Sequence, residues 1–230
     1  EVQFSSPSEA IDAGIGMVHQ HFMLADQLTV LENVVLGAEP THRGVIDYRS
    51  ARRHLDELGS SYGLDLHPND FVESLEVGER QRVEIIKVLY RGAKVLILDE
   101  PTSVLVPQEV EKLFSNLREL KARGHTIIFI DHKLEEVLAI ADTITVLRQG
   151  RTVATMASDQ VTAAELAELM VGSELPKPST EPRVADQHVT LSLNSATVPG
   201  DDGRPALDAV DLEIHRGEIL GVAGVEGNGQ

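Results

Sequence analysis

A short apolar run that ends in two acids and a proline constrains this chain more than any other feature. Residues 95–98 read Val-Leu-Ile-Leu, and Asp99, Glu100 and Pro101 follow directly. This pattern predicts a buried strand whose carboxyl end carries both carboxylates, where ligands bind in open α/β sheets. A Mg²⁺ ion on nucleotide phosphates prefers a hard ligand such as Asp99, and Glu100 could polarise an attacking water as general base. The alternative interpretation is a strand that simply ends in two solvated acids.

Two further β-branched runs, residues 15–19 and 126–130, alternate with stretches of helical periodicity. That alternation predicts an α/β fold with a parallel sheet covered by helices on both faces. Between the first two strands, from about residue 25 to residue 92, apolar residues recur at helical spacing. This stretch is therefore predicted to be a helical insertion.

The rest of the first unit and its boundary are predicted from turn residues and prolines. A terminal hairpin is predicted from two β-branched runs joined through a Gln-Gly pair, residues 144–147 and 152–155. A short helix is predicted at residues 163–170. Residues 174–187 contain Pro176, Pro178 and Pro182 without apolar periodicity, which is typical of a linker. The first domain is thus expected to span residues 1–173.

A second unit is expected over residues 188–230. Its predicted strands are residues 189–193, 208–214 and 219–223, with turns predicted at residues 199–203 and at Arg216-Gly217. Only the first strands of that unit are expected within this chain.

Composition narrows the choice of partners. The formal net charge of −17 argues against tight nucleic-acid binding, because phosphate contacts need a local excess of Lys and Arg. The absence of cysteine excludes a disulfide framework and thiolate chemistry, and it suits a reducing cytoplasm. The apolar runs are too short to span a bilayer, so any link to a membrane is expected to run through a partner.

Residues 95–103 resemble the Walker B strand and D-loop of ABC ATPases, and the other landmarks follow in that family's order. Residues 18–20 resemble the Q-loop, which implies that Gln20 senses Mg²⁺ and the attacking water and contacts the transport domain. Residues 130–133 resemble the switch loop, which implies that a neutral His132 donates to the γ-phosphate and holds Glu100 in register. Outside this series, Gln20 and His132 would read as ordinary surface residues.

Residues 74–82 occupy the position of the family's signature motif, which opens a helix against the γ-phosphate bound by an opposing domain. The resemblance implies nucleotide contacts from Leu75, Glu76, Val77, Gly78 and Glu79. Glu76 stands where the family has a serine, and an ionised carboxylate offers phosphate no hydrogen bond and repels its charge. This departure places catalysis at that site in doubt, unless the acid merely complements the helix dipole.

The chain ends in a glycine-rich stretch that resembles a phosphate loop, in which backbone N–H groups wrap a phosphate. The resemblance implies nucleotide binding by Gly224, Gly227, Asn228, Gly229 and Gln230. Gln230 stands where the phosphate-binding lysine belongs, so the loop lacks its main point charge.

The resemblance covers almost the whole chain. In detail, the sequence is similar to the tandem ATPases of sugar and nucleoside importers. It implies a RecA-like P-loop NTPase core with a helical subdomain, followed by the first strands of a second ABC domain. It further implies ATP and Mg²⁺ as cofactors. The implied partners are membrane permease subunits, an extracytoplasmic solute-binding protein and a second nucleotide-binding domain, at the cytoplasmic face of the membrane. The Gly-Asn-Gly-Gln sequence of residues 227–230 looks more like the nucleoside branch.

Two consequences of the resemblance concern activity. The first phosphate loop and its strand are expected to precede residue 1, so the chain alone should not hydrolyse ATP, and the strand at residues 95–98 should lack a central neighbour. Head-to-tail pairing of two domains would place Glu76 and Gln230 in one weak site, while Asp99, Glu100 and His132 serve the hydrolytic one. The alternatives left open are a soluble tandem ABC protein acting in translation or repair, and a regulatory remnant that does not hydrolyse ATP.

Overall fold

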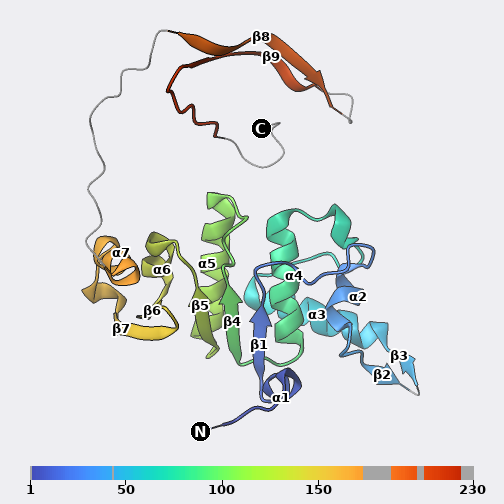
Figure 1. Ribbon diagram of the computed structural model, residues 1–230. Helices are drawn as coiled ribbons and strands as arrows, with labels where there is room; N and C mark the ends of the chain where they lie inside the picture. Colours follow the sequence, from blue (N-terminus) through green and yellow to red (C-terminus); the bar gives the residue numbers. More distant parts are fainter. Residues whose placement is uncertain (1, 43, 173–187, 201–204, 224–230) are drawn as a thin grey trace. The chain divides into compact units, whose positions relative to one another are not determined.

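The computed structural model describes residues 2–42, 44–172, 188–200 and 205–223 (Figure 1). The chain divides into two compact units, Glu1–Leu175 and Pro176–Gln230. No helix in the part of the chain that the structure describes combines the length and the apolar character needed to cross a membrane.

The first unit alternates short strands and helices. In chain order its elements are α1 (Pro7–Asp12), β1 (Ile15–Val18), α2 (Val30–Val35), β2 (Thr41–His42), β3 (Val45–Ile46), α3 (Tyr48–Tyr62), a 3₁₀ turn (Val72–Ser74), α4 (Val77–Tyr90), β4 (Val95–Asp99), α5 (Pro107–Ala122), β5 (Thr126–Ile130), α6 (Leu134–Ile140), β6 (Thr143–Arg148), β7 (Arg151–Ala157), a second 3₁₀ turn (Ser158–Gln160) and α7 (Ala163–Val171).

The three predicted parallel strands pair in the order β1-β4-β5. Val18 lies opposite Leu98 in β4, and Asp99 lies opposite Ile130 in β5, so the three carboxyl ends meet at one edge. Because β4 is central and hydrogen-bonded on both sides, the expectation that residues 95–98 would lack a neighbour is wrong. The two unpaired edges of the described sheet belong to β1 and β5.

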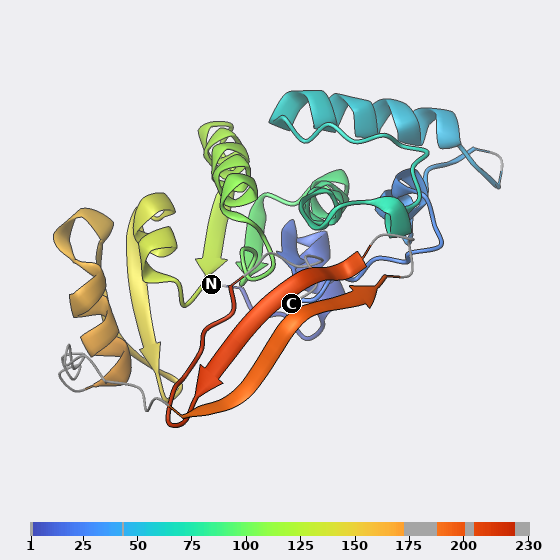
Figure 2. The same ribbon diagram turned by 90° about the horizontal axis from the view of Figure 1, so that it is seen from above.

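Helices α4 and α5 cover the same face of this sheet (Figure 2). The chain passes from β1 to β4 through α4 and from β4 to β5 through α5, so both connections move across the sheet in the same direction. Because such connections are right-handed, two that move in the same direction place their helices on the same face of the sheet. Leu96 and Leu98 are buried on that face, whereas Ile128 and Ile130 on the other face are exposed. The prediction of helices on both faces is therefore wrong for the described residues.

The predicted helical insertion is present and carries the larger core. Helices α2 and α3 pack on α4, with Val34, Leu55 and Ile86 fully or almost fully buried between them. The small β2–β3 hairpin inside this region was not predicted, because its strands are two residues each and exposed on both faces.

The predicted hairpin after β5 is confirmed as β6 and β7, which pair antiparallel. Gln149 and Gly150 connect the strands with positive φ angles of 50° and 73°, as a tight hairpin turn requires. The predicted short helix is α7, whose Leu166 packs into a second core with Val137 and Val146.

The second unit, taken by itself, contains the antiparallel strands β8 (Val189–Pro199) and β9 (Pro205–His215). These confirm and lengthen two predicted strands. The predicted strand at residues 219–223 is not formed, and Ile219 is 91% exposed, because no strand in the described part of this unit is paired with it. A turn forms at Arg216 and Gly217, whereas residues 201–204 and the predicted linker at 174–187 lie outside the described residues.

Candidate functional site

The carboxylate of Glu100 lies between two side chains from neighbouring strand ends. Gln20, just after β1, donates a hydrogen bond from Nε2 to Oε2 of Glu100 at 2.8 Å. Nδ1 of His132, just after β5, lies 3.2 Å from Oε1 of the same carboxylate. The structure thus brings together all three residues predicted to be catalytic, because the carboxyl ends of three parallel strands meet at one edge of the sheet.

The backbone of Glu100 has a conformation that favours glycine. Its φ angle is 44°, in the left-handed region, and its N–H donates to the carbonyl of Ile130 at 2.9 Å. Such a conformation costs about 1–3 kcal/mol in a residue that carries a Cβ. This left-handed conformation turns the chain after β4. The turn places the Glu100 carboxylate between Gln20 and His132.

The hydrogen bonds define which atoms remain available for a ligand. Because the amide nitrogen of Gln20 is engaged by Glu100, its Oε1 is left as an acceptor, the type of oxygen that Mg²⁺ binds. A neutral imidazole has one N–H, and at His132 the contact with an ionised Glu100 uses it at Nδ1. A neutral His132 therefore cannot donate to Glu100 and to a phosphate at the same time. Only the doubly protonated ring can perform both predicted roles.

The predicted metal ligands fit an ion that is held largely by phosphate and water. Asp99 ends β4 and is partly exposed at the edge where Gln20 lies. Among the described residues no group of three or more His, Cys, Asp or Glu side chains is placed to hold a metal ion. Mg²⁺ commonly keeps one or two protein oxygens and completes its shell with substrate phosphates and water. One carboxylate and one amide oxygen match that requirement.

A buried network that was not predicted supports the loop of His132. Asp131 has a side chain only 1% exposed, and its Oδ1 accepts the backbone N–H groups of His132 at 2.7 Å and Lys133 at 2.9 Å. Its Oδ2 accepts the Thr102 hydroxyl at 2.9 Å, and Nζ of Lys133 donates to the Thr102 carbonyl at 2.8 Å. The network fastens the turn after Glu100 to the turn that carries His132. The sequence signal was the position of Asp131 and Thr102 beside two predicted catalytic residues.

The predicted signature residues form the start of α4. Glu76 is the exposed N-cap, and its backbone N–H donates to the side chain of Glu79 at 3.2 Å. The N–H of Gly78 donates to Oε1 of Glu109, from α5, at 3.2 Å, and any Cβ at Gly78 would collide with that oxygen. Leu75 and Val77 are partly buried beside this turn. The beginning of α4 is therefore surrounded by three carboxylates.

Helix α4 also contacts the residue that follows Glu100. Gln81, almost fully buried, donates from Nε2 to the carbonyl of Pro101 at 2.5 Å. The signature turn and the acid pair are thus joined through a buried hydrogen bond. The remaining predicted nucleotide-binding residues, which form the glycine-rich stretch, lie outside the described residues: Gly224, Gly227, Asn228, Gly229 and Gln230.

Residues 2–103 match the sequence model of the family described as ABC transporter. The chain is 44% identical to the nucleoside import ATP-binding protein NupA of Lactococcus lactis subsp. cremoris, over 98% of this chain and 44% of that protein. It is equally identical to the guanosine import ATP-binding protein NupO of Bacillus subtilis, over all of this chain and 45% of that protein. It is also 44% identical to the glucose import ATP-binding protein TsgD13 of Haloferax volcanii, over all of this chain and 47% of that protein. The chain spans about half the length of these curated relatives.

Solved structures show the same fold. The protein cbiO1 from Clostridium perfringens, part of the ABC transporter complex cbiONQ, is 28% identical with a TM-score of 0.57, over 67% of this chain and 62% of that chain. A nucleotide-free ATP-binding cassette from an ABC transporter is 24% identical with a TM-score of 0.56, over 66% of this chain and 64% of that chain. The fold is therefore that of an α/β P-loop NTPase of the ABC cassette type.

Proposed function

We propose that this chain, whose residues 2–103 match the ABC transporter family, belongs to a subunit that hydrolyses ATP to drive import of a nucleoside or a simple sugar. The observation that carries the proposal is the Glu100 carboxylate, held by Gln20 at 2.8 Å and His132 at 3.2 Å. A general base must keep a fixed direction toward the water that it activates, and two donors on two carboxylate oxygens provide that direction.

Each residue of the site has a distinct proposed role. Glu100 accepts a proton from the attacking water, while the amide oxygen of Gln20 and the carboxylate of Asp99 would hold Mg²⁺. His132 orients Glu100 and, when doubly protonated, donates to a phosphate oxygen. Mg²⁺, when bound, neutralises charge on the nucleotide phosphates. Positioning and charge stabilisation of this kind supply most of the catalysis in phosphoryl transfer.

The proposed partners follow from the names of the similar proteins, which are import ATP-binding proteins. We infer that the subunit works at the cytoplasmic face of a membrane, with two permease subunits, an extracytoplasmic solute-binding protein and a second nucleotide-binding domain. Because a complete ATP site needs a phosphate loop as well as the residues described above, we propose that residues 1–230 alone do not hydrolyse ATP.

Of the two substrate classes, we propose nucleosides first. Two of the similar proteins at 44% identity are named for nucleoside or guanosine import, and one is named for glucose import. The Gly-Asn-Gly-Gln sequence at residues 227–230 also looks more like the nucleoside branch. Simple sugars remain the second class to be tested.

We further propose that the site completed by α4 is the weaker of two. Glu76 is exposed at the start of the helix, and Glu109 already accepts the N–H of Gly78, which would otherwise be free to bind an anion. Negative charge around the helix start opposes the approach of a triphosphate.

The experiment is ATP-driven uptake by the full-length protein, reconstituted in vesicles with its proposed permease and solute-binding protein. Radiolabelled guanosine and adenosine should accumulate with ATP but not with a non-hydrolysable analogue, and more than ribose or glucose. ATP turnover that does not change when the permease is added would favour the soluble tandem ATPase. Nucleotide binding without turnover in any mixture would favour the regulatory alternative.

A further inference from the structure

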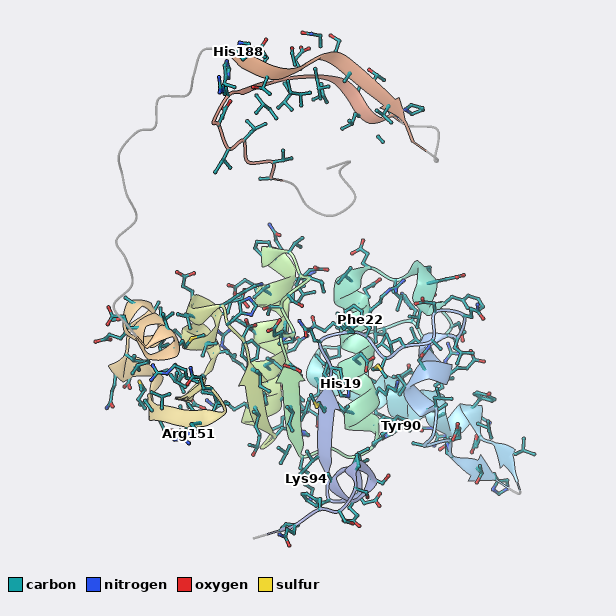
Figure 3. The ribbon with its side chains drawn as sticks, viewed as in Figure 1. His19, Phe22, Tyr90, Lys94, Arg151 and His188 are labelled. Atoms are coloured by element: carbon teal, nitrogen blue, oxygen red, sulfur yellow. The ribbon has the colours of Figure 1, made fainter. Side chains whose placement is uncertain are left out.

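Three charged side chains on one stripe of α4 contact the segment that leaves β1. Arg80, Glu84 and Lys87 are spaced i, i+4 and i+7, which places them on one face of the helix. Arg80 pairs with Asp26 at 3.1 Å, while Glu84 and Lys87 both bind the backbone of Met23. Figure 3 labels His19 and Phe22 in this segment, where it runs alongside α4.

Both backbone polar groups of Met23 are held by α4. The Met23 N–H donates to Oε1 of Glu84 at 2.6 Å, and the Met23 carbonyl accepts from Nζ of Lys87 at 2.9 Å. Glu84 is only 4% exposed, whereas Met23 itself is 65% exposed. We call these two hydrogen bonds, from Glu84 and Lys87 to the backbone of Met23, the Met23 clamp. The clamp fixes the backbone of a residue whose side chain is exposed to solvent, so it does not serve to bury Met23.

Gln20 lies between two anchors. On one side, Val18 is paired with Leu98 in the sheet, and on the other side Met23 is clamped to α4. The short stretch between them carries Gln20, whose amide reaches Glu100 at 2.8 Å. Without the contacts at Met23, the next fixed point would be Ala25, whose N–H donates to the buried Asn33 at 2.8 Å, so the stretch would be longer and Gln20 would sample more positions.

We propose that Glu84 is a positioning residue that fastens the segment after β1 to α4 and thereby holds Gln20 against Glu100. The inference rests on the proposed ATPase function and deepens it. Helix α4 also holds the carbonyl of Pro101 through Gln81, so a shift of this helix would displace Glu100 both through Gln20 and through Pro101.

The first test is a double-mutant cycle of ATP turnover in the full-length protein assembled with its permease. Removing the acceptor of the Met23 N–H should lower turnover about tenfold in Glu84→Ala, while Glu84→Gln keeps an acceptor and retains most activity. In a Gln20→Ala background the same Glu84→Ala change should cost less than about twofold, because both act through one contact. Glu111→Ala, an exposed glutamate on α5, is the matched control and should leave turnover unchanged.

An equal loss in both backgrounds would overturn the proposal, because it would mean that Glu84 only supports the fold. If Glu84→Ala does not fold, Lys87→Met replaces it in the same double-mutant cycle. We expect Lys87→Met to lower ATP turnover by less, and its effect should again be smaller in the Gln20→Ala background.

The second test needs no turnover and separates the clamp from the proposed function. Hydrogen exchange at the Met23 amide should be faster in Glu84→Ala and unchanged in Glu111→Ala. Unchanged exchange at Met23 would contradict the clamp even if the protein hydrolyses ATP. Faster exchange in a protein without any turnover would support the clamp while refuting the proposed function.

Discussion

The amide nitrogen of Gln20 donates a 2.8 Å hydrogen bond to Oε2 of Glu100, across 80 positions of sequence. The contact leaves Oε1 of Glu100 for His132 and Oε1 of Gln20 for a ligand. Contacts on both oxygens fix the direction of the carboxylate, and a general base needs a fixed direction toward the water that it activates.

Removing the proposed general base should strongly lower ATP hydrolysis and leave nucleotide binding nearly unchanged. In the full-length protein, Glu100→Gln should lower ATP turnover by about 10²–10⁴-fold, because the amide cannot accept a proton from water. Nucleotide affinity should remain within about threefold, since the change removes no phosphate contact. Turnover and equilibrium nucleotide binding measured on the same preparation check both statements. Turnover close to wild type in Glu100→Gln would remove Glu100 from this role.

The protonation state of His132 can be observed directly. Because Nδ1 faces an ionised carboxylate at 3.2 Å, we expect the proton of the neutral ring to reside on Nδ1 in the nucleotide-free protein. Nitrogen chemical shifts of labelled histidine should show this tautomer, and the preference should disappear in Glu100→Ala. His19→Ala, an exposed histidine beside the site, serves for assignment and should leave the His132 signal unchanged. A ring protonated on Nε2 alone would contradict the proposed contact.

The strained backbone of Glu100 predicts an unusual order of stability. At a φ angle of 44°, Glu100→Gly should be more stable than Glu100→Ala by about 1 kcal/mol, because only glycine adopts this conformation without a Cβ penalty. Chemical denaturation of both variants measures the difference. The usual order, with alanine more stable, would show that position 100 is not left-handed in solution.

Glu76 and Gln230 should act together. In the full-length protein Glu76→Ser alone should raise turnover less than about twofold, because the phosphate loop still lacks its lysine charge. Glu76→Ser combined with Gln230→Lys should exceed the product of the two single effects. If Glu76→Ala or Gln230→Ala abolished turnover as completely as Glu100→Gln, both sites would be catalytic and the asymmetric hypothesis would be wrong.

Acid should weaken the first unit through its helix caps. The backbone N–H and hydroxyl of Thr162 both donate to Glu165 at 2.8 Å, which lowers the pKa of that carboxyl below its usual value of 4.5. Thr29 lowers the pKa of Glu32 in the same way. A depressed folded-state pKa stabilises the protein above the unfolded value, and this stability is lost as pH falls through the folded one. Denaturation of wild type and Glu165→Gln should therefore differ at pH 7 and converge once the pH falls below the depressed folded-state pKa of Glu165. A difference that does not change with pH would contradict the assignment.

Local pattern was sufficient to predict the strands and the candidate catalytic residues. An apolar run of about five residues, followed by acids or by a polar loop, identifies β1, β4 and β5 without any partner in view. The Gln-Gly pair predicted the β6–β7 hairpin, because two successive positive φ angles are a property of the turn itself. Strands of a parallel sheet end together, so Gln20, Glu100 and His132 could be expected at one edge.

Long-range contacts decided the rest. Which face α4 and α5 cover depends on the direction in which the strands are ordered, and no local window contains that information. Residues 219–223 have the pattern of a strand, yet a strand forms only where another one pairs with it. The bonds from Asp131 to Thr102 and from Glu84 to Met23 span 29 and 61 positions of sequence. Sequence alone shows these residues only as polar side chains, because a buried partner is defined by the packing of the whole unit.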